Sequence, residues 1–110
     1  MTASELPPPL RPLPGGRLPE PSVAAAQGRL RESGLEPMTW GNGPGDRYAA
    51  HEHGYTKLLV CATGSITFLV GDDETAVELI AGEGFELPPG TRHAAIVGPD
   101  GCTCVEGHRG

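Results

Sequence analysis

Apolar and β-branched residues from Leu35 onward fall in short runs, which clusters of Gly, Pro, Asn and Asp separate. Runs of this length between turn residues predict β-strands rather than helices. A turn about every 8 to 12 residues is typical of an antiparallel sandwich or barrel. The predicted strands cover residues 38–40, 47–53, 57–63, 65–70, 75–80, 85–87, 93–97 and 102–106.

Glycine-rich segments mark the expected turns between these strands. Residues 71–73, Gly-Asp-Asp, predict a hairpin turn, and residues 88–90, Pro-Pro-Gly, predict a tight turn before His93. Gly64 and residues 98–101 are also expected to turn the chain between neighbouring strands. The last four residues are expected to fray.

The segment from Ser22 to Glu32 is the one stretch with helical spacing. Its apolar residues Val23 and Leu30 fall on one face together with Ala26, and Ser22 is a suitable N-cap. Gly34 follows as a suitable C′ residue. So short a helix is not stable alone, so we expect it to pack on the outside of the barrel.

The first 21 residues carry seven of the twelve prolines of the chain. Proline fixes φ and lacks an N–H donor, which predicts an extended, poorly ordered arm. The 110 residues are enough for one domain. The expected organisation is a flexible proline-rich arm over 1–21, a short helix over 22–34 and a β-barrel domain over 35–110.

Composition and charge exclude some classes of partner. The net charge of −6 and the lack of a basic cluster argue against a nucleic-acid partner. No apolar run approaches the roughly 20 residues of a membrane span, and the polar start does not resemble a signal peptide, so we expect a cytoplasmic protein. The odd number of cysteines (Cys61, Cys102 and Cys104) predicts free, buried thiols rather than disulfides.

Histidines carry the candidate chemistry. His51 and His53 lie two residues apart, so on a strand both side chains point to one face, and a regular strand gives Lys57 the same parity. His93 follows the Pro-Gly turn and supplies a third imidazole. Three histidines from separate strands can hold a divalent metal, although an isolated His-x-His pair is more often solvated on an edge strand. His108 is expected to be solvated.

The spacing around these histidines resembles two sequence motifs of the cupin family. Residues 45–64 resemble the first motif, but Lys57 stands where the family has a glutamate. Residues 82–93 resemble the second motif, which in the family often continues to an asparagine where this chain has Val97. The resemblance implies a small antiparallel double-stranded β-helix, a jelly-roll-like barrel whose interior carries a metal on His51, His53 and His93.

The three histidines do not select one metal, because imidazole suits Fe, Mn, Ni, Cu, Co and Zn. The resemblance implies a metal-dependent enzyme, an oxygenase or an isomerase, acting on a small molecule. Lys57 and Tyr55 are the candidate catalytic residues.

If Lys57 points into the barrel, its ammonium would repel the metal by about 4 kcal/mol at 4 Å with an effective dielectric of 20. A non-catalytic module that binds a metal or a small anion is therefore the alternative. Candidate substrate contacts are Tyr48, Tyr55, Arg47, Arg92 and Trp40.

A homodimer is the expected assembly. A barrel of about 75 residues buries little surface by itself and has edge strands to cover. Met38 and Trp40, on the first predicted strand of the barrel, are the expected contacts between subunits, and the arm is a candidate to lie across the partner.

Overall fold

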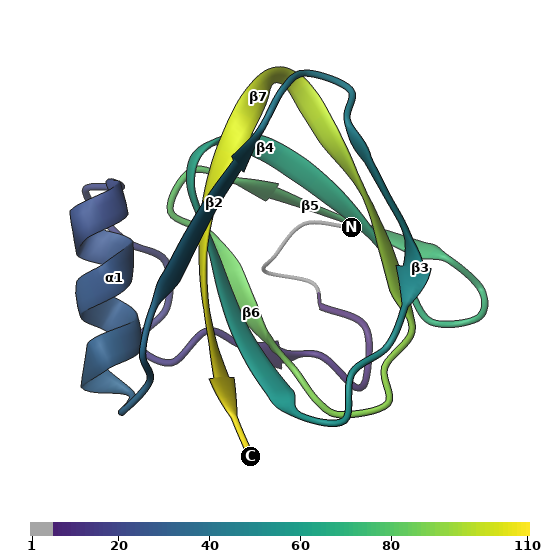
Figure 1. The fold of residues 1–110 in the computed structure, drawn as a ribbon, viewed down its shortest axis with the longest axis horizontal. Helices are drawn as coiled ribbons and strands as arrows, with labels where there is room; N and C mark the ends of the chain where they lie inside the picture. Colours follow the sequence, from purple (N-terminus) through teal and green to yellow (C-terminus); the bar gives the residue numbers. More distant parts are fainter. Residues whose placement is uncertain (1–5) are drawn as a thin grey trace.

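The computed structural model describes residues 6–110, in which the regular structure comprises one helix and seven strands. The helix α1 spans Val23–Glu32. The strands are β1 (Arg11–Pro12), β2 (Met38–Asn42), β3 (Arg47–His51), β4 (Thr56–Val70), β5 (Thr75–Ile80), β6 (Gly84–Leu87) and β7 (His93–Arg109). Figure 1 shows the strands curling into an open barrel with α1 on its outside. The predicted all-β jelly-roll architecture is confirmed.

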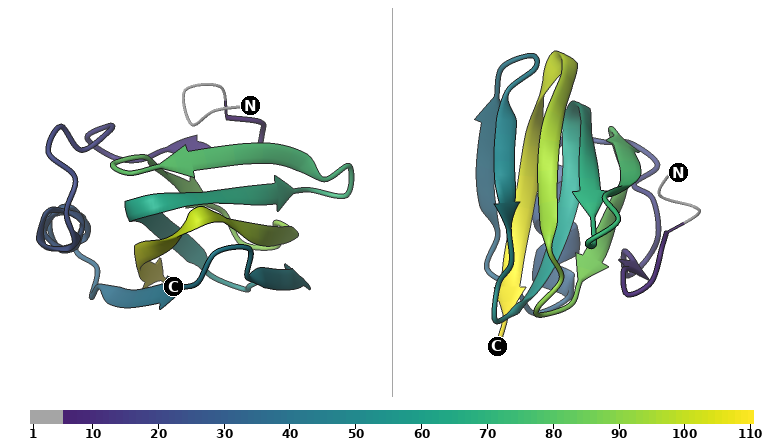
Figure 2. Two further views of the ribbon diagram at one scale, coloured as in Figure 1. Left: turned by 90° about the horizontal axis from the view of Figure 1, so that it is seen from above. Right: turned by 90° about the vertical axis from the view of Figure 1, so that its right-hand side faces the viewer.

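Two long strands organise the barrel. β4 and β7 pair antiparallel along most of their length, from Thr56 opposite Arg109 to Val70 opposite His93. The first half of β4 also pairs with β6 and its second half with β5. β7 pairs with β3 at its start and with β2 at its end. Each long strand therefore contributes to both halves of the curled sheet, as the two views of Figure 2 show.

The side chains of β4 alternate between two apolar environments. Leu59 and Cys61 face the barrel core, whereas Leu58 and Val60 face the cluster that includes α1. Both faces are buried, which explains the continuous apolar run in this part of the sequence. Burial on both sides fixes the register of β4 and thereby the direction in which Lys57 points.

The predicted turns at Gly64 and at residues 98–101 are wrong, because both segments lie inside the long strands. Gly64 has a φ of +71°, and the pairing of β4 with β7 shifts register around it. A Cβ at Gly64 would lie 2.0 Å from the carbonyl oxygen of Gly101. The glycines therefore allow the two strands to bend and cross closely, rather than to reverse the chain.

The proline-rich segment is not a loose arm over residues 6–21. Leu10, Leu13 and Leu18 are buried against the barrel of their own chain. β1 pairs with β6, and the guanidinium of Arg29 donates hydrogen bonds to the carbonyl oxygens of Pro14 and Gly16. Every third to fifth residue of the segment is a leucine, and these leucines dock it. Residues 1–5, where the same arm was predicted, lie outside the described residues.

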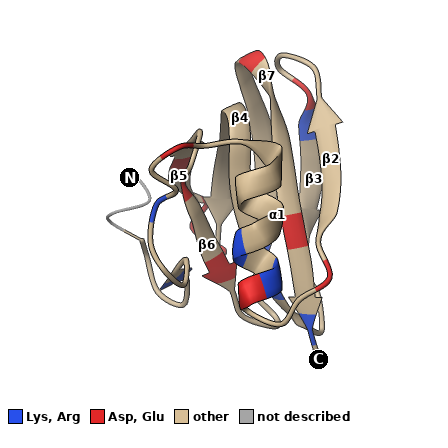
Figure 3. Ribbon diagram, turned by 90° about the vertical axis from the view of Figure 1, so that its left-hand side faces the viewer, with Lys and Arg blue, Asp and Glu red and all other residues tan. Residues whose placement is uncertain are grey.

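The predicted helix is confirmed. The hydroxyl of Ser22 accepts a hydrogen bond from the amide of Ala25 at 3.0 Å, and Ala26 and Leu30 are fully buried. On the face shown in Figure 3, basic and acidic segments are interspersed on and around α1. Within residues 6–110, no helix is long and apolar enough to cross a membrane.

Candidate metal centre

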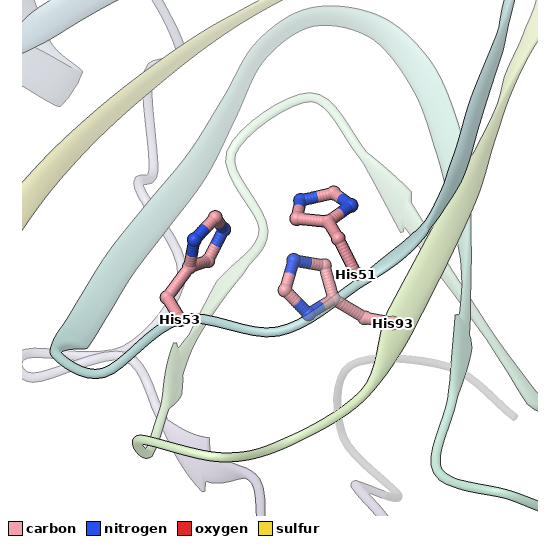
Figure 4. Close-up of side chains that lie close together, drawn as sticks. All are labelled: His51, His53 and His93. Atoms are coloured by element: carbon pink, nitrogen blue, oxygen red, sulfur yellow. The ribbon is translucent and has the colours of Figure 1, made fainter.

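The barrel brings His51, His53 and His93 together. His51 is the last residue of β3 and lies opposite His93, the first residue of β7. β3 ends earlier than predicted, and His53 lies in the connection to β4, after a register shift between Tyr48 and His51. One ligand nitrogen from each ring lies within 4.8 Å of the others, and Figure 4 shows the three imidazoles gathered at one place.

Backbone carbonyls fix two of the rings. The Nδ1 atom of His51 lies 2.8 Å from the oxygen of Ala49, and that of His93 lies 2.9 Å from the oxygen of Thr91. A carbonyl oxygen only accepts, so Nδ1 carries the proton in both rings and Nε2 keeps its lone pair. The pattern is that of histidines whose other ring nitrogen is oriented for a metal.

Two of the imidazole nitrogens have no partner. The Nε2 atoms of His53 and His93 are buried and have no hydrogen-bond partner within residues 6–110. A buried polar atom without a partner costs about 1 to 3 kcal/mol. A bound cation would satisfy these lone pairs, so the donor set fits a divalent transition metal.

Burial keeps His53 and His93 neutral. It lowers the pKa of His93 to about 4, against the opposing bond to Thr91, and neighbouring charge on His51, Lys57 and His53 lowers it further. Burial also lowers the pKa of His53, with Lys57 as the next cause. Neutral imidazole is the form that binds metal, so at neutral pH His53 and His93 need not lose a proton first.

A pocket of about 240 Å³ adjoins the histidines. Three of the five predicted substrate contacts, Trp40, Tyr48 and Tyr55, line it. Arg92 instead lines a second, more polar groove, and Arg47 is exposed on β3. The other lining residues are His51, His53, His93, Lys57, Leu59, Phe68, Ala95 and Glu106.

Lys57 faces this pocket, and its partner there, Glu106, was not predicted from the sequence. The Lys57 side chain is buried, and its Nζ lies 3.6 Å from Oε1 of Glu106. Glu106 also accepts hydrogen bonds from the indole N–H of Trp40 at 2.7 Å and from Nε2 of His108 at 2.5 Å. The pocket therefore contains a carboxylate, although from β7 rather than from the first motif.

Opposing influences set the ionisation of Glu106. Burial alone raises the pKa of its carboxyl, but the hydrogen bond from His108, the charge of Lys57 and the bond from Trp40 together hold it below its ordinary value. Glu106 does not belong to the group of atoms close enough to share a metal with the three histidines. It is therefore an ionised wall of the pocket rather than a fourth ligand in this arrangement.

The prediction of a frayed tail with a solvated His108 is wrong. β7 continues to Arg109, and the His108 ring stacks on Tyr55 with centroids 4.2 Å apart. Tyr55 stacks in turn on His53 at 4.8 Å. The sequence contains a signal for this arrangement, because Glu106 and His108 lie two residues apart on the last strand, as His51 and His53 do before β4.

The three cysteines are free and buried, as predicted. Cys61 and Cys104 are opposite each other on β4 and β7, and the sulfur of Cys104 lies 4.0 Å from that of Cys102. All three belong to the apolar core and none lines the pocket.

No protein-family model and no curated protein matches the sequence. Solved structures do. A chain from the crystal structures of the DMSP lyases RdDddP and RnDddQII has a TM-score of 0.63 and 25% identity, over 69% of this chain and 38% of that one. An RmlC-like cupin from Shewanella frigidimarina has a TM-score of 0.59 and 23% identity, covering 67% and 64%. The Drosophila melanogaster CENP-C cupin domain has a TM-score of 0.62 and 13% identity, covering 66% and 59%.

This chain spans between 38% and 64% of the length of these three structures. At such identities the likeness concerns the arrangement of the strands. Proteins with this arrangement differ in what they do, so the activity has to be argued from the site.

Proposed function

The chain has the cupin fold, and from that premise we propose that it binds one divalent transition metal through His51, His53 and His93 and acts on a small molecule in the adjoining pocket. The observation that carries the proposal is the pair of buried, unpartnered Nε2 atoms on His53 and His93, with a nitrogen of His51 within 4.8 Å. Three protein ligands are the arrangement of catalytic rather than structural sites, because they leave positions open.

When bound, the metal would supply Lewis acidity to a substrate oxygen. The remaining tasks belong to side chains of this chain. Leu59, Phe68 and Ala95 make part of the pocket wall apolar and so limit water at the site. Burial raises the pKa of the Tyr55 phenol, and the nearby Glu106 raises it further, so Tyr55 keeps its proton and can donate a hydrogen bond into the pocket.

Three reaction classes agree with this site. Oxygenation and isomerisation are the classes implied by the resemblance, and the similar fold among DMSP lyases adds elimination to those worth screening. The alternative is a metal-binding module without catalysis. Oxygen-consumption and product screening of the metal-loaded protein with thiols, diketones and phenolic acids separates an enzyme from such a module.

The metal site is tested by calorimetric titration of the full chain with zinc. We expect one zinc per chain and at least a hundredfold loss of affinity on His51→Ala, His53→Ala or His93→Ala. The matched control is His108→Ala, which removes the remaining histidine of the chain and should leave the stoichiometry at one. Full affinity in the triple His→Ala variant of the triad would refute the assignment.

A further inference from the structure

Lys57 is placed as a cation that faces a cavity. It lies directly opposite His108 in the pairing of β4 with β7, so both side chains project from one face of the sheet, and that face is the pocket wall. Glu106, two residues before His108 on the same strand, shares this face. The three charged or polar side chains therefore stand together beside the pocket.

The ammonium of Lys57 is only partly satisfied by Glu106. Their separation of 3.6 Å is that of an ion pair and exceeds the length of an ordinary hydrogen bond. Both oxygens of Glu106 already accept other hydrogen bonds, one from Trp40 and one from His108. At this separation Glu106 balances the charge of Lys57 without accepting a hydrogen bond from its N–H groups, which remain for a group inside the pocket.

Beside this ion pair, part of the pocket wall is apolar and aromatic. Leu59, Phe68 and Ala95 line it, together with the edge-to-face pair of Trp40 and Tyr48, whose ring centroids are 5.4 Å apart. A ligand that satisfies both parts needs one anionic end and one flat or apolar body. A ligand without an acceptor group would leave the ammonium N–H groups without a hydrogen-bond partner once water is displaced.

We propose that Lys57 is the anion anchor of this pocket and that the ligand is a small organic acid, whose carboxylate binds Lys57 and whose apolar body packs on the aromatic wall. The inference rests on the proposed function in one respect, the orientation of the rest of the ligand toward the three histidines. Binding of the carboxylate itself depends only on Lys57. Glu106 is the positioning residue, because it holds the ammonium at the wall through its bonds to Trp40 and His108.

The test compares two probes of the same shape, benzoate and benzamide, by calorimetric titration of the full chain. It is run on zinc-loaded protein and on protein stripped with a chelator, because zinc itself attracts a carboxylate. We expect benzoate to bind at least tenfold more tightly than benzamide in both forms. Equal binding of the two probes in the stripped protein overturns the anchor.

Variants separate the anchor from a purely structural ion pair. Lys57→Arg should keep the preference for benzoate, and Lys57→Met should abolish it. Because Lys57→Met leaves Glu106 without its cation, the double variant Lys57→Met/Glu106→Gln provides a neutral, folded counterpart and should also show no preference. Arg92→Met removes a cation outside the pocket and should change nothing. Retention of the wild-type preference in the double variant overturns the anchor.

Zinc binding measured on the same samples keeps the two proposals apart. Wild-type protein that binds one zinc per chain, but in its stripped form shows no preference for benzoate, overturns the anchor alone. A preference that depends on Lys57 in a protein that binds no zinc sinks the proposed metal function and leaves the anchor standing.

Discussion

At the scale of single residues, the site combines a histidine triad suited to a metal with a lysine beside it. The first motif places a lysine, Lys57, where the resemblance implies a carboxylate, and the structure supplies a carboxylate from another strand, at Glu106. The pocket therefore holds a cation and a carboxylate, and the cation stands at the position where the resemblance implies the carboxylate. Bound metal would stand near the cation, so the triad must bind it without help from a carboxylate at position 57.

Lys57→Glu tests this reading of the charges. In the metal-free protein the change puts two buried carboxylates side by side and should lower the free energy of unfolding by about 3 to 5 kcal/mol. It also removes a cation and adds a ligand beside the triad, so zinc affinity should rise at least tenfold. Lys57→Met, which removes the cation only, should give a smaller rise. Unchanged or weaker zinc affinity in folded Lys57→Glu protein, measured by calorimetry, would mean that Lys57 does not oppose the metal.

His93 should make the metal-free protein acid-sensitive. Its pKa lies at about 4 in the folded state and at 6.5 as an ordinary histidine, so the unfolded state binds the proton first as the pH falls. Stability is complete above pH 6.5 and is lost between 6.5 and 4, by up to about 3 kcal/mol. Urea unfolding at several pH values with chelator present measures it. His93→Gln should lack this part of the pH dependence, and an equal slope in both proteins would contradict the shift.

The residues of the triad could be predicted from the sequence because two short motifs mark them locally. The sequence missed Glu106 and His108, because their relation to Lys57 depends on the register between β4 and β7, which are about 50 residues apart in the chain. It also misjudged the proline-rich segment. The prolines predicted an extended, poorly ordered arm, whereas Leu10, Leu13 and Leu18 dock the segment against the core of its own chain.

At the scale of elements, the two long strands depend on glycines that the sequence presents as turns. Gly64 has a positive φ and a backbone neighbour where a Cβ would lie, while Gly98 passes close to Ser65 of the facing strand. A bend in paired strands and a reversal of the chain use the same residue types, so local sequence does not distinguish them. The bend lets one strand take part in both halves of the barrel.

Two glycine substitutions should act in opposite directions. Gly64→Ala adds a Cβ within 2.0 Å of the Gly101 oxygen at a φ of +71°, so we expect the free energy of unfolding to fall by at least about 3 kcal/mol. Gly28→Ala lies in α1 with nothing within 4 Å of the new Cβ and should raise it by about 0.5 to 1 kcal/mol. Chemical denaturation measures both. Similar stability of the two variants would contradict the role given to Gly64.

At the scale of the whole molecule, the exposed apolar residues of the barrel indicate where a second subunit could bind. Trp40 was expected to contact a partner subunit, but its indole lines the pocket and donates to Glu106. Met38 on the same strand is 50% exposed, and β2 stands at one end of the strand order. Met38 therefore remains the residue of that strand available to a partner, and edge strands commonly need covering.

We expect a homodimer that buries Met38. Light scattering at micromolar concentration should give about twice the chain mass of 11.4 kDa. Met38→Lys places a charge in that contact and should give the monomer mass. Ile80→Lys is the matched control, since Ile80 is the other large apolar residue exposed among residues 6–110, at 42%, and lies on β5. A wild-type monomer, or a dimer that Ile80→Lys alone disrupts, would argue against this surface.

We propose that three imidazoles, and no sulfur, hold the metal. Zinc-edge X-ray absorption of protein loaded with one zinc per chain measures this directly. We predict nitrogen or oxygen neighbours only, at about 2.0 to 2.1 Å, with the outer-shell scattering of three imidazole rings. Sulfur at about 2.3 Å would place the metal on Cys61, Cys102 or Cys104 instead, and scattering from fewer than three imidazoles would equally contradict the triad.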